Sequence, residues 1–151
     1  MLGLIAFALM LRTPKVTGLS MSPEIDSGEY VLIDTLTYRI SEPKRGEIVA
    51  FRHDRPEAAI YLKRVIGLPG DQVRIDRGWV FIDGRRLDEP YVRFHDGATL
   101  PETVVGAQQY YVLGDNRQNS DDSRDWGAVQ RSDIVGRALF GIWPLSRAGA
   151  L

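Results

Sequence analysis

The chain has no cysteine among its 151 residues and only two histidines, His53 and His95. The first absence excludes thiol nucleophiles, disulfide bonds and thiolate metal sites, and leaves the cellular compartment open. Neither histidine has a second metal ligand at a recognisable spacing, and no acid completes a Ser-His-Asp pattern. We therefore expect neither a metal site nor a histidine-based catalytic site.

An excess of charge of either sign is also missing. The 19 basic and 20 acidic side chains are interspersed and give a formal net charge of -1. No basic stripe or acidic tail therefore favours a nucleic acid or polyanion partner. A chain of this length fits one compact domain, or one domain with a small insertion, and buries about two thirds of the surface exposed when it is unfolded.

No apolar run is long enough to cross a membrane as a helix, which needs about 20 residues. The uncharged stretch at residues 1–11 (MLGLIAFALML) is followed by Arg12 and Lys15. It lacks the preceding basic region and the following small-residue cleavage pattern of a secretory signal. From hydropathy alone it is interpreted as a buried or frayed short N-terminal apolar helix.

Beyond Pro14, short apolar runs alternate with Gly, Pro, Asp and Asn at the intervals typical of strands and turns. Asp76-Arg77-Gly78 and Asp83-Gly84-Arg85 are favourable hairpin turns, because glycine tolerates the positive φ that tight turns need. Residues 91–108 lack a pattern and are interpreted as a loop or a small excursion from the main sheet. The predicted strands are Tyr30–Ile33, Glu47–Phe51, Ile60–Ile66, Gln72–Ile75, Trp79–Ile82, Gln109–Leu113 and Ile134–Trp143. The fold class predicted is mainly β, an antiparallel, partly closed β-barrel-like domain.

Two residue runs together offer a nucleophile and its base. Ser20 lies in Gly-Leu-Ser-Met-Ser-Pro, between Gly18 and Pro23, where its hydroxyl could be presented at the end of a strand. Lys63 lies in an apolar-flanked predicted strand, so its amine can point into the fold. A neutral lysine near pH 8 requires burial to lower its pKa by about 2 units from about 10.4. The sequence thus predicts a Ser/Lys acyl-transfer site that only tertiary folding can assemble.

A third run, Gly114–Gly127 (GDNRQNSDDSRDWG), is too rich in polar and turn-forming residues for an ordinary hairpin connection. The three runs, with Arg45–Phe51 (RGEIVAF) between the first two, closely resemble the motifs of bacterial type I signal peptidases. The resemblance covers roughly residues 16–145, in the family's order.

The resemblance implies roles for individual residues. The serine matching Ser20 attacks the peptide carbonyl, and the lysine matching Lys63 is the general base. The serine matching Ser120 hydrogen-bonds and orients the lysine, while Asp122 and Arg124 form a supporting ion pair. Gly18 stands where some members carry a serine that helps to bind the oxyanion, so the backbone N–H of Ser20, Thr17 or a water remain alternatives for that task.

The family's substrates carry small residues one and three places before the cut, which requires shallow apolar pockets beside strands that pair with an extended peptide. The candidate substrate-binding residues are Met21, Tyr61 and Leu62, each of which could equally be a plain core residue.

The resemblance further implies a membrane-associated serine endopeptidase without metal or organic cofactor, whose partners are signal-peptide-bearing precursors and membrane lipid. We expect residues 1–13 to be a partial, single-pass membrane anchor and residues 14–151 a monomeric catalytic domain on the outer face of the cytoplasmic membrane. Residues 84–108 would form a small excursion from that domain.

Two other interpretations compete with this one. A self-cleaving repressor-type peptidase also uses a Ser-Met run and a strand lysine, but it would need a DNA-binding domain and a scissile bond upstream of Ser20, where only 19 apolar-rich residues lie. A catalytically silent β-barrel binding or chaperone module would be favoured by loss of Ser20 or Lys63, and both are present.

Overall fold

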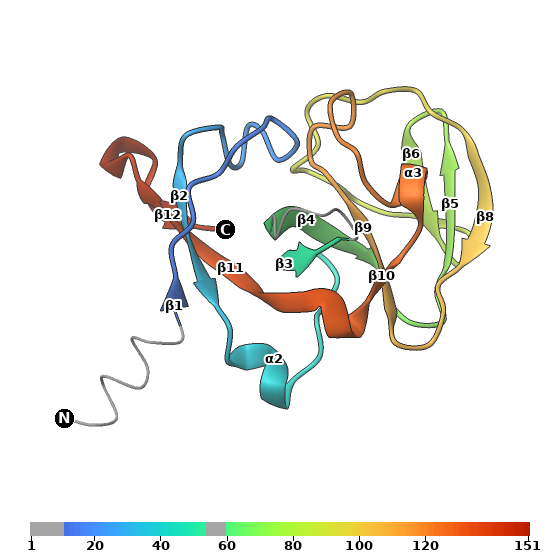
Figure 1. The fold of residues 1–151 in the computed structure, drawn as a ribbon. Coiled ribbons are helices and arrows are strands. Elements are labelled where there is room, and N and C mark those ends of the chain that lie inside the picture. Colours follow the sequence, from blue (N-terminus) through green and yellow to red (C-terminus); the bar gives the residue numbers. More distant parts are fainter. Residues whose placement is uncertain (1–10, 54–59) are drawn as a thin grey trace.

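The computed structural model describes residues 11–53 and 60–151, which form two antiparallel β-sheets (Figure 1). The larger sheet is strongly curled, and its longest strand, β11, pairs with β2, β3 and the short β12. Along the sheet the order is β1-β2-β11-β3-β4-β9-β10. The strands of this sheet are β1 (Leu11–Arg12), β2 (Tyr30–Asp34), β3 (Ile48–Arg52), β4 (Ile60–Gly67), β9 (Gln109–Leu113), β10 (Val129–Gln130), β11 (Ile134–Trp143) and β12 (Gly149–Ala150).

The smaller sheet has the order β7-β6-β5-β8 and lies on the right of Figure 1. Its strands are β5 (Gln72–Asp76), β6 (Trp79–Ile82), β7 (Arg85–Arg86) and β8 (Leu100–Val104). The turns β5–β6 and β6–β7 each place two successive residues at positive φ, which is the geometry that matches the twist of a tight hairpin. These residues are Arg77 (49°) with Gly78 (81°), and Asp83 (50°) with Gly84 (77°). Both predicted hairpin turns are confirmed.

Helices are short throughout the described ranges. They are α2 (Thr37–Ile40), α3 (Ser123–Trp126) and the 3-10 turns η1 (Arg131–Asp133) and η2 (Leu145–Arg147). Within residues 11–53 and 60–151, no helix is both long and apolar enough to cross a membrane. The predicted N-terminal apolar helix falls largely on residues 1–10, outside the described residues, whereas Leu11 and Arg12 pair with β2 as β1.

The core consists of three apolar clusters that follow the strands. β2 and β5 alternate buried with less buried residues, as strands with one covered face do, while β3 and β4 are buried along most of their length.

The mainly antiparallel β fold with its curled, partly closed sheet is confirmed, and the seven predicted strands match β2, β3, β4, β5, β6, β9 and β11 to within one residue at each end. For residues 91–108 the sequence predicts a loop or a small excursion from the main sheet, without a strand, whereas the structure has β8 here, which pairs with β5 in the smaller sheet. Its sequence, Leu-Pro-Glu-Thr-Val, is largely exposed and so lacks the apolar alternation of a half-buried strand.

Gly67, the last residue of β4, packs against residues of both sheets and allows a test of this packing. A Cβ there would lie 2.7 Å from Val73 Cγ2 and 2.9 Å from Tyr111 Cβ, with no flexible chain end to yield. We predict that Gly67→Ala lowers the free energy of unfolding by about 1–3 kcal/mol, as overpacking of a core does. Gly149→Ala, where a Cβ meets nothing within 4 Å, is the control and should stay within about 0.5 kcal/mol. Equal effects of the two changes in urea unfolding would contradict this packing.

Candidate active site

Ser20 lies on a turn whose following residues are anchored in the core. Met21 and Ile25 are fully buried, and the Ile25 N–H donates to the Met21 carbonyl at 2.9 Å. Gly18 precedes the turn at a φ of 97°, a conformation that side chains disfavour. The prediction that Ser20 is presented at the end of a strand was therefore wrong, because the apolar residues after it close a turn instead of extending.

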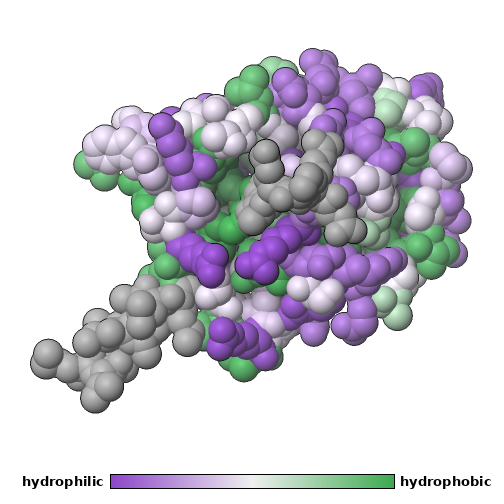
Figure 2. Space-filling view, viewed as in Figure 1, coloured by the Kyte–Doolittle hydropathy of each residue, from purple (hydrophilic) through white to green (hydrophobic). Residues whose placement is uncertain are grey.

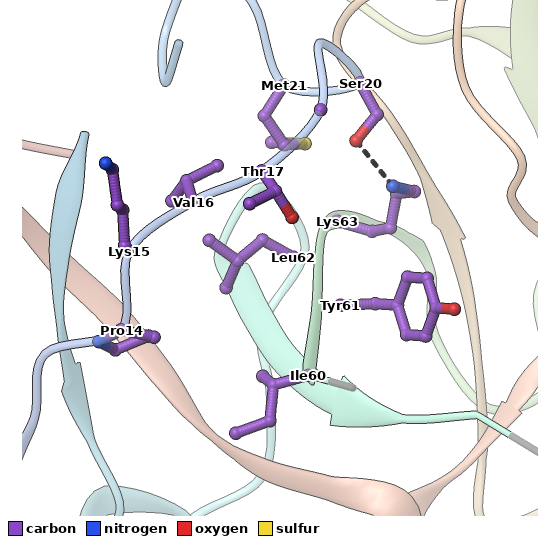
Figure 3. Close-up of a pocket in the computed structure, with 11 residues that line it drawn as sticks. Pro14, Lys15, Val16, Thr17, Ser20, Met21, Ile60, Tyr61, Leu62 and Lys63 are labelled. Carbon is purple, nitrogen blue, oxygen red and sulfur yellow. Dashed lines mark hydrogen bonds between the residues drawn. The ribbon is translucent and has the colours of Figure 1, made fainter. Parts of the chain in front are cut away.

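Lys63 lies in the middle of β4 and reaches Ser20 across the fold. Its Nζ donates a hydrogen bond to Ser20 Oγ at 2.7 Å, drawn as the dashed line in Figure 3. The lysine is only 4% exposed. The two residues, 43 positions apart in sequence, thus lie at the distance over which a proton can pass between them.

Burial changes the ionisation of this lysine. Loss of solvent around the amine lowers the pKa of Lys63 from 10.5 to about 8, although the negative charges of Asp122 and Asp121 act in the opposite direction. A substantial fraction of the amine is therefore neutral in mildly alkaline solution, and a neutral amine can accept the proton of a serine hydroxyl.

The polar segment 114–127 is held against the Ser20 turn by close backbone contact. The Asn116 N–H donates to the Ser20 carbonyl at 3.0 Å. A Cβ at position 114 would collide with Ser120 Oγ and would lie 2.5 Å from the Ser20 carbonyl oxygen. Only glycine at position 114 lets the two segments approach this closely.

Asp122 organises this segment from a fully buried position. Its carboxylate accepts hydrogen bonds from the Gly114 N–H (3.0 Å), from Ser120 Oγ (2.7 Å) and from Arg124 Nε and Nη2 (both 2.8 Å). It also caps α3, accepting from the Arg124 N–H while Asp125 completes a capping box. Burial alone would raise the pKa of Asp122, but the bonds and charge of Arg124, with those from Gly114 and Ser120, hold it below its usual value. The carboxylate is therefore ionised.

The structure thus brings the sequence-predicted residues into one neighbourhood, with one difference. Asp122 and Arg124 form an ion pair. The Ser120 hydroxyl donates to Asp122, and no hydrogen bond between Ser120 and Lys63 is recorded among the described residues. Asp122 therefore connects the two residues. It accepts a hydrogen bond from Ser120, and its negative charge acts on the Lys63 amine.

Sequence reasoning missed the outer partners of this network. Arg124 pairs with Asp96, and Gln118 Nε2 donates to the His95 carbonyl at 2.7 Å, so the segment preceding β8 braces the site. Next to Lys63, Arg64 makes a two-pronged ion pair with Asp115 at 2.9 and 2.6 Å. No local spacing rule links these partners, which lie 28, 23 and 51 residues apart.

A pocket of about 210 Å³ opens beside the Ser/Lys pair. Figure 3 shows Leu62 extending toward Val16, Thr17 and Met21, while Tyr61 extends from the opposite side of β4. The three predicted substrate-binding residues and Gly18 all line this pocket, together with Pro14, Lys15, Val16, Thr17, Ser20, Ile60 and Lys63. Over the part of the chain that the structure describes, no group of three or more potential metal ligands occurs.

A serine hydroxyl that is hydrogen-bonded to a buried amine of lowered pKa is the pair of groups that a serine peptidase with a lysine base requires. Here the pair is carried by a mainly antiparallel β fold. The chain matches the family model "Signal peptidase, peptidase S26" over residues 1–143 and belongs to that family, which is serine-based.

Individual relatives agree with this assignment. The chain is 41% identical over 140 residues to a probable signal peptidase I-2 of Synechocystis sp., a match that covers 87% of this chain and 63% of that protein. It is 36% identical over 146 residues to signal peptidase I of Bacillus caldolyticus, covering 87% and 79%. A crystal structure of a signal peptidase I from Enterococcus faecalis V583 superimposes with a TM-score of 0.54 at 33% identity, over 65% of this chain and 97% of that one.

The lowered pKa of Lys63 has a consequence for stability. Because the folded-state pKa (about 8) lies below the unfolded value (10.5), the folded state binds the lysine proton less tightly, which costs about 3 kcal/mol below pH 8 and is relieved as the pH rises toward 10.5. We predict that Lys63→Met raises the free energy of unfolding by about 2–3 kcal/mol at pH 7 and by less than half of that at pH 9.5.

Lys44→Met, at an exposed position, is the matched control and should change stability by less than about 0.5 kcal/mol. A gain in Lys63→Met that did not depend on pH would argue against a burial-depressed amine.

Proposed function

We propose that this protein is a membrane-associated serine endopeptidase that removes N-terminal signal peptides from exported precursor proteins. Ser20 is the nucleophile and Lys63 the general base. The observation that carries the proposal is the 2.7 Å contact between Lys63 Nζ and Ser20 Oγ at a lysine whose pKa burial lowers to about 8.

The reaction proceeds through an acyl-enzyme. Neutral Lys63 accepts the Ser20 proton while Ser20 Oγ attacks the scissile carbonyl, and the resulting ammonium then protonates the leaving amine. Water, deprotonated by the same amine, hydrolyses the ester and restores the serine. Asp122 and Ser120 hold segment 114–127 in place beside the pair, which keeps the amine aligned for both proton transfers.

The oxyanion of the tetrahedral intermediate requires a hydrogen-bond donor close to Ser20. The Ser20 N–H has no recorded protein acceptor within the described residues, which leaves it available for this task. Gly18 contributes the backbone turn before the nucleophile and no side-chain donor.

The substrate binds as an extended strand along β4. Ile60, Tyr61 and Leu62 pair with β3 on one side, whereas β9 begins to pair with β4 only at Arg64. The other edge of β4 at these residues therefore borders the active-site pocket and offers backbone groups to a peptide. Met21 and Leu62 give that pocket an apolar surface, and its volume of about 210 Å³ suits small side chains next to the scissile bond.

The membrane location rests on the apolar N-terminus and on exposed aromatic residues. We propose that residues 1–13 belong to an anchor and that residues 14–151 form a monomeric catalytic domain at the outer face, with 84–108 as an excursion. Phe140 and Trp143 at the end of β11 are 44% and 55% exposed, and aromatic side chains of this kind favour the lipid interface.

The test is cleavage of a purified signal-peptide precursor in detergent between pH 6 and 10. We predict that kcat/KM rises with pH to a plateau, with an apparent pKa of about 8, because only neutral Lys63 accepts the proton. Ser20→Ala and Lys63→Ala should each lower kcat/KM by at least about 10³-fold. Ser132→Ala and Lys44→Ala, both at exposed positions, should cleave like the wild type. Folded wild-type protein that cleaves no precursor would instead favour a binding module.

Asp121 offers a finer version of this test. Its exposed carboxylate raises the pKa of Lys63, so Asp121→Asn should shift the pH profile to lower pH while leaving the plateau unchanged. A shift to higher pH would contradict the assignment of the profile to Lys63.

A further inference from the structure

A second pocket, of about 500 Å³, lies apart from the active site and shares none of its lining residues. Four arginines from different elements line it. Arg12 comes from β1, Arg39 from α2, Arg52 from β3 and Arg131 from η1. The side chains of Tyr38, Ile134 and Val135 supply an apolar lining. Figure 2, in the view of Figure 1, shows hydrophilic side chains gathered between its two grey segments, the part of the surface near these elements.

Most of the arginines in this pocket have no ion-pair partner among residues 11–53 and 60–151. Arg131 is paired with Glu42 at 2.6 Å, but no ion pair is recorded for Arg12, Arg39 or Arg52 in the described ranges, and these three residues are exposed. None of the residues that line the pocket is acidic. Elsewhere the structure neutralises its less exposed arginines, as at Arg64 and Arg117. Several guanidinium groups around one hollow repel one another, and a bound anion relieves that repulsion.

The chemistry of the lining selects the kind of anion. Guanidinium groups match the oxygens of a phosphate with paired hydrogen bonds, better than a lysine ammonium does. The apolar surface of Tyr38, Ile134 and Val135 suits a ligand that carries a hydrocarbon part beside its phosphate. Arg12 also directly follows the uncharged residues 1–11 in the sequence, and basic residues that flank an apolar segment meet the lipid headgroups.

We propose that this arginine pocket (Arg12, Arg39, Arg52 and Arg131) binds the phosphate headgroup of an anionic membrane lipid. This inference rests on the membrane location proposed above, but not on the Ser/Lys chemistry. Headgroup binding adds an electrostatic attachment to those made by the apolar N-terminus and the exposed aromatic residues proposed above. Each further attachment to the bilayer surface restricts the rotation of the domain, and hence the direction in which the active-site pocket faces.

The experiment compares binding of the full chain to phosphatidylcholine vesicles with and without about 30% phosphatidylglycerol, measured by vesicle sedimentation at low salt. One basic residue near an anionic surface contributes roughly fivefold in affinity. We therefore expect Arg39→Gln with Arg52→Gln to weaken binding to the anionic vesicles by about 25-fold, while binding to pure phosphatidylcholine stays unchanged. Arg39→Lys with Arg52→Lys keeps the charge but loses the paired guanidinium hydrogen bonds, so its affinity should lie between that of the wild type and that of the glutamine variant.

The matched control removes the same charge from another surface. Arg85 and Arg93 are exposed, and Arg85 lies on β7 of the smaller sheet, so Arg85→Gln with Arg93→Gln should weaken binding less than about threefold.

An equal loss in both double variants, or no preference of the wild type for anionic vesicles, would overturn the proposal. Saturable binding of inorganic phosphate that depends on Arg39 and Arg52, without a vesicle preference, would also overturn it and identify a soluble phosphate ligand. Cleavage of a detergent-solubilised precursor should be unaffected by the pocket substitutions, so failure here and failure of the peptidase assignment are distinguishable.

Discussion

The burial of one lysine amine against one serine hydroxyl is the constraint on which the rest of this structure depends. A lysine amine is substantially neutral near pH 8 only when burial excludes water from it and lowers its pKa. Lys63 meets this condition on β4, which lies between β3 and β9 in the larger sheet. The hydroxyl that meets this amine does not come from a neighbouring residue in sequence. The Ser20 turn is instead brought over from the N-terminal side of β2 and fastened by Met21 and Ile25 in the core.

Asp122 limits how far the pKa of Lys63 falls. It is buried, ionised and bonded to Arg124, Ser120 and the Gly114 backbone, so it stabilises the segment that lies against the Ser20 turn. The same negative charge favours the protonated amine, so it raises the pKa of Lys63, whereas desolvation lowers it. The pKa of about 8 for Lys63 is the balance between these effects. The pairing of Arg124 with Asp96 neutralises part of the surrounding charge and connects the network to the chain that leads into β8.

Sequence patterns predicted the main strands and the catalytic candidates because both depend on local signals. Strands such as β9 and β11 have β-branched and aromatic residues bounded by turn formers, and the runs around Ser20, Lys63 and Ser120 carry their own motifs. The misses share a physical cause. β8 is an exposed edge strand without apolar alternation, and Ser20 lies on a turn because of long-range packing of Met21. The pairing of Arg64 with Asp115 and of Arg124 with Asp96 joins residues that no local spacing connects.

Titration of Lys63 itself tests whether its burial beside Ser20 gives an amine that is partly neutral near pH 8. The chain has three lysines, at positions 15, 44 and 63, so ¹³Cε-labelled lysine gives a simple spectrum in which Lys63→Arg identifies the signal of Lys63. We expect this signal to titrate with a pKa of about 8, and the lysine of the Ser20→Ala protein to keep a lowered pKa because burial is the main cause of the shift. A Lys63 signal that titrates only above about pH 10, as a solvated lysine does, would show that the amine stays protonated near pH 8 and cannot act as the base.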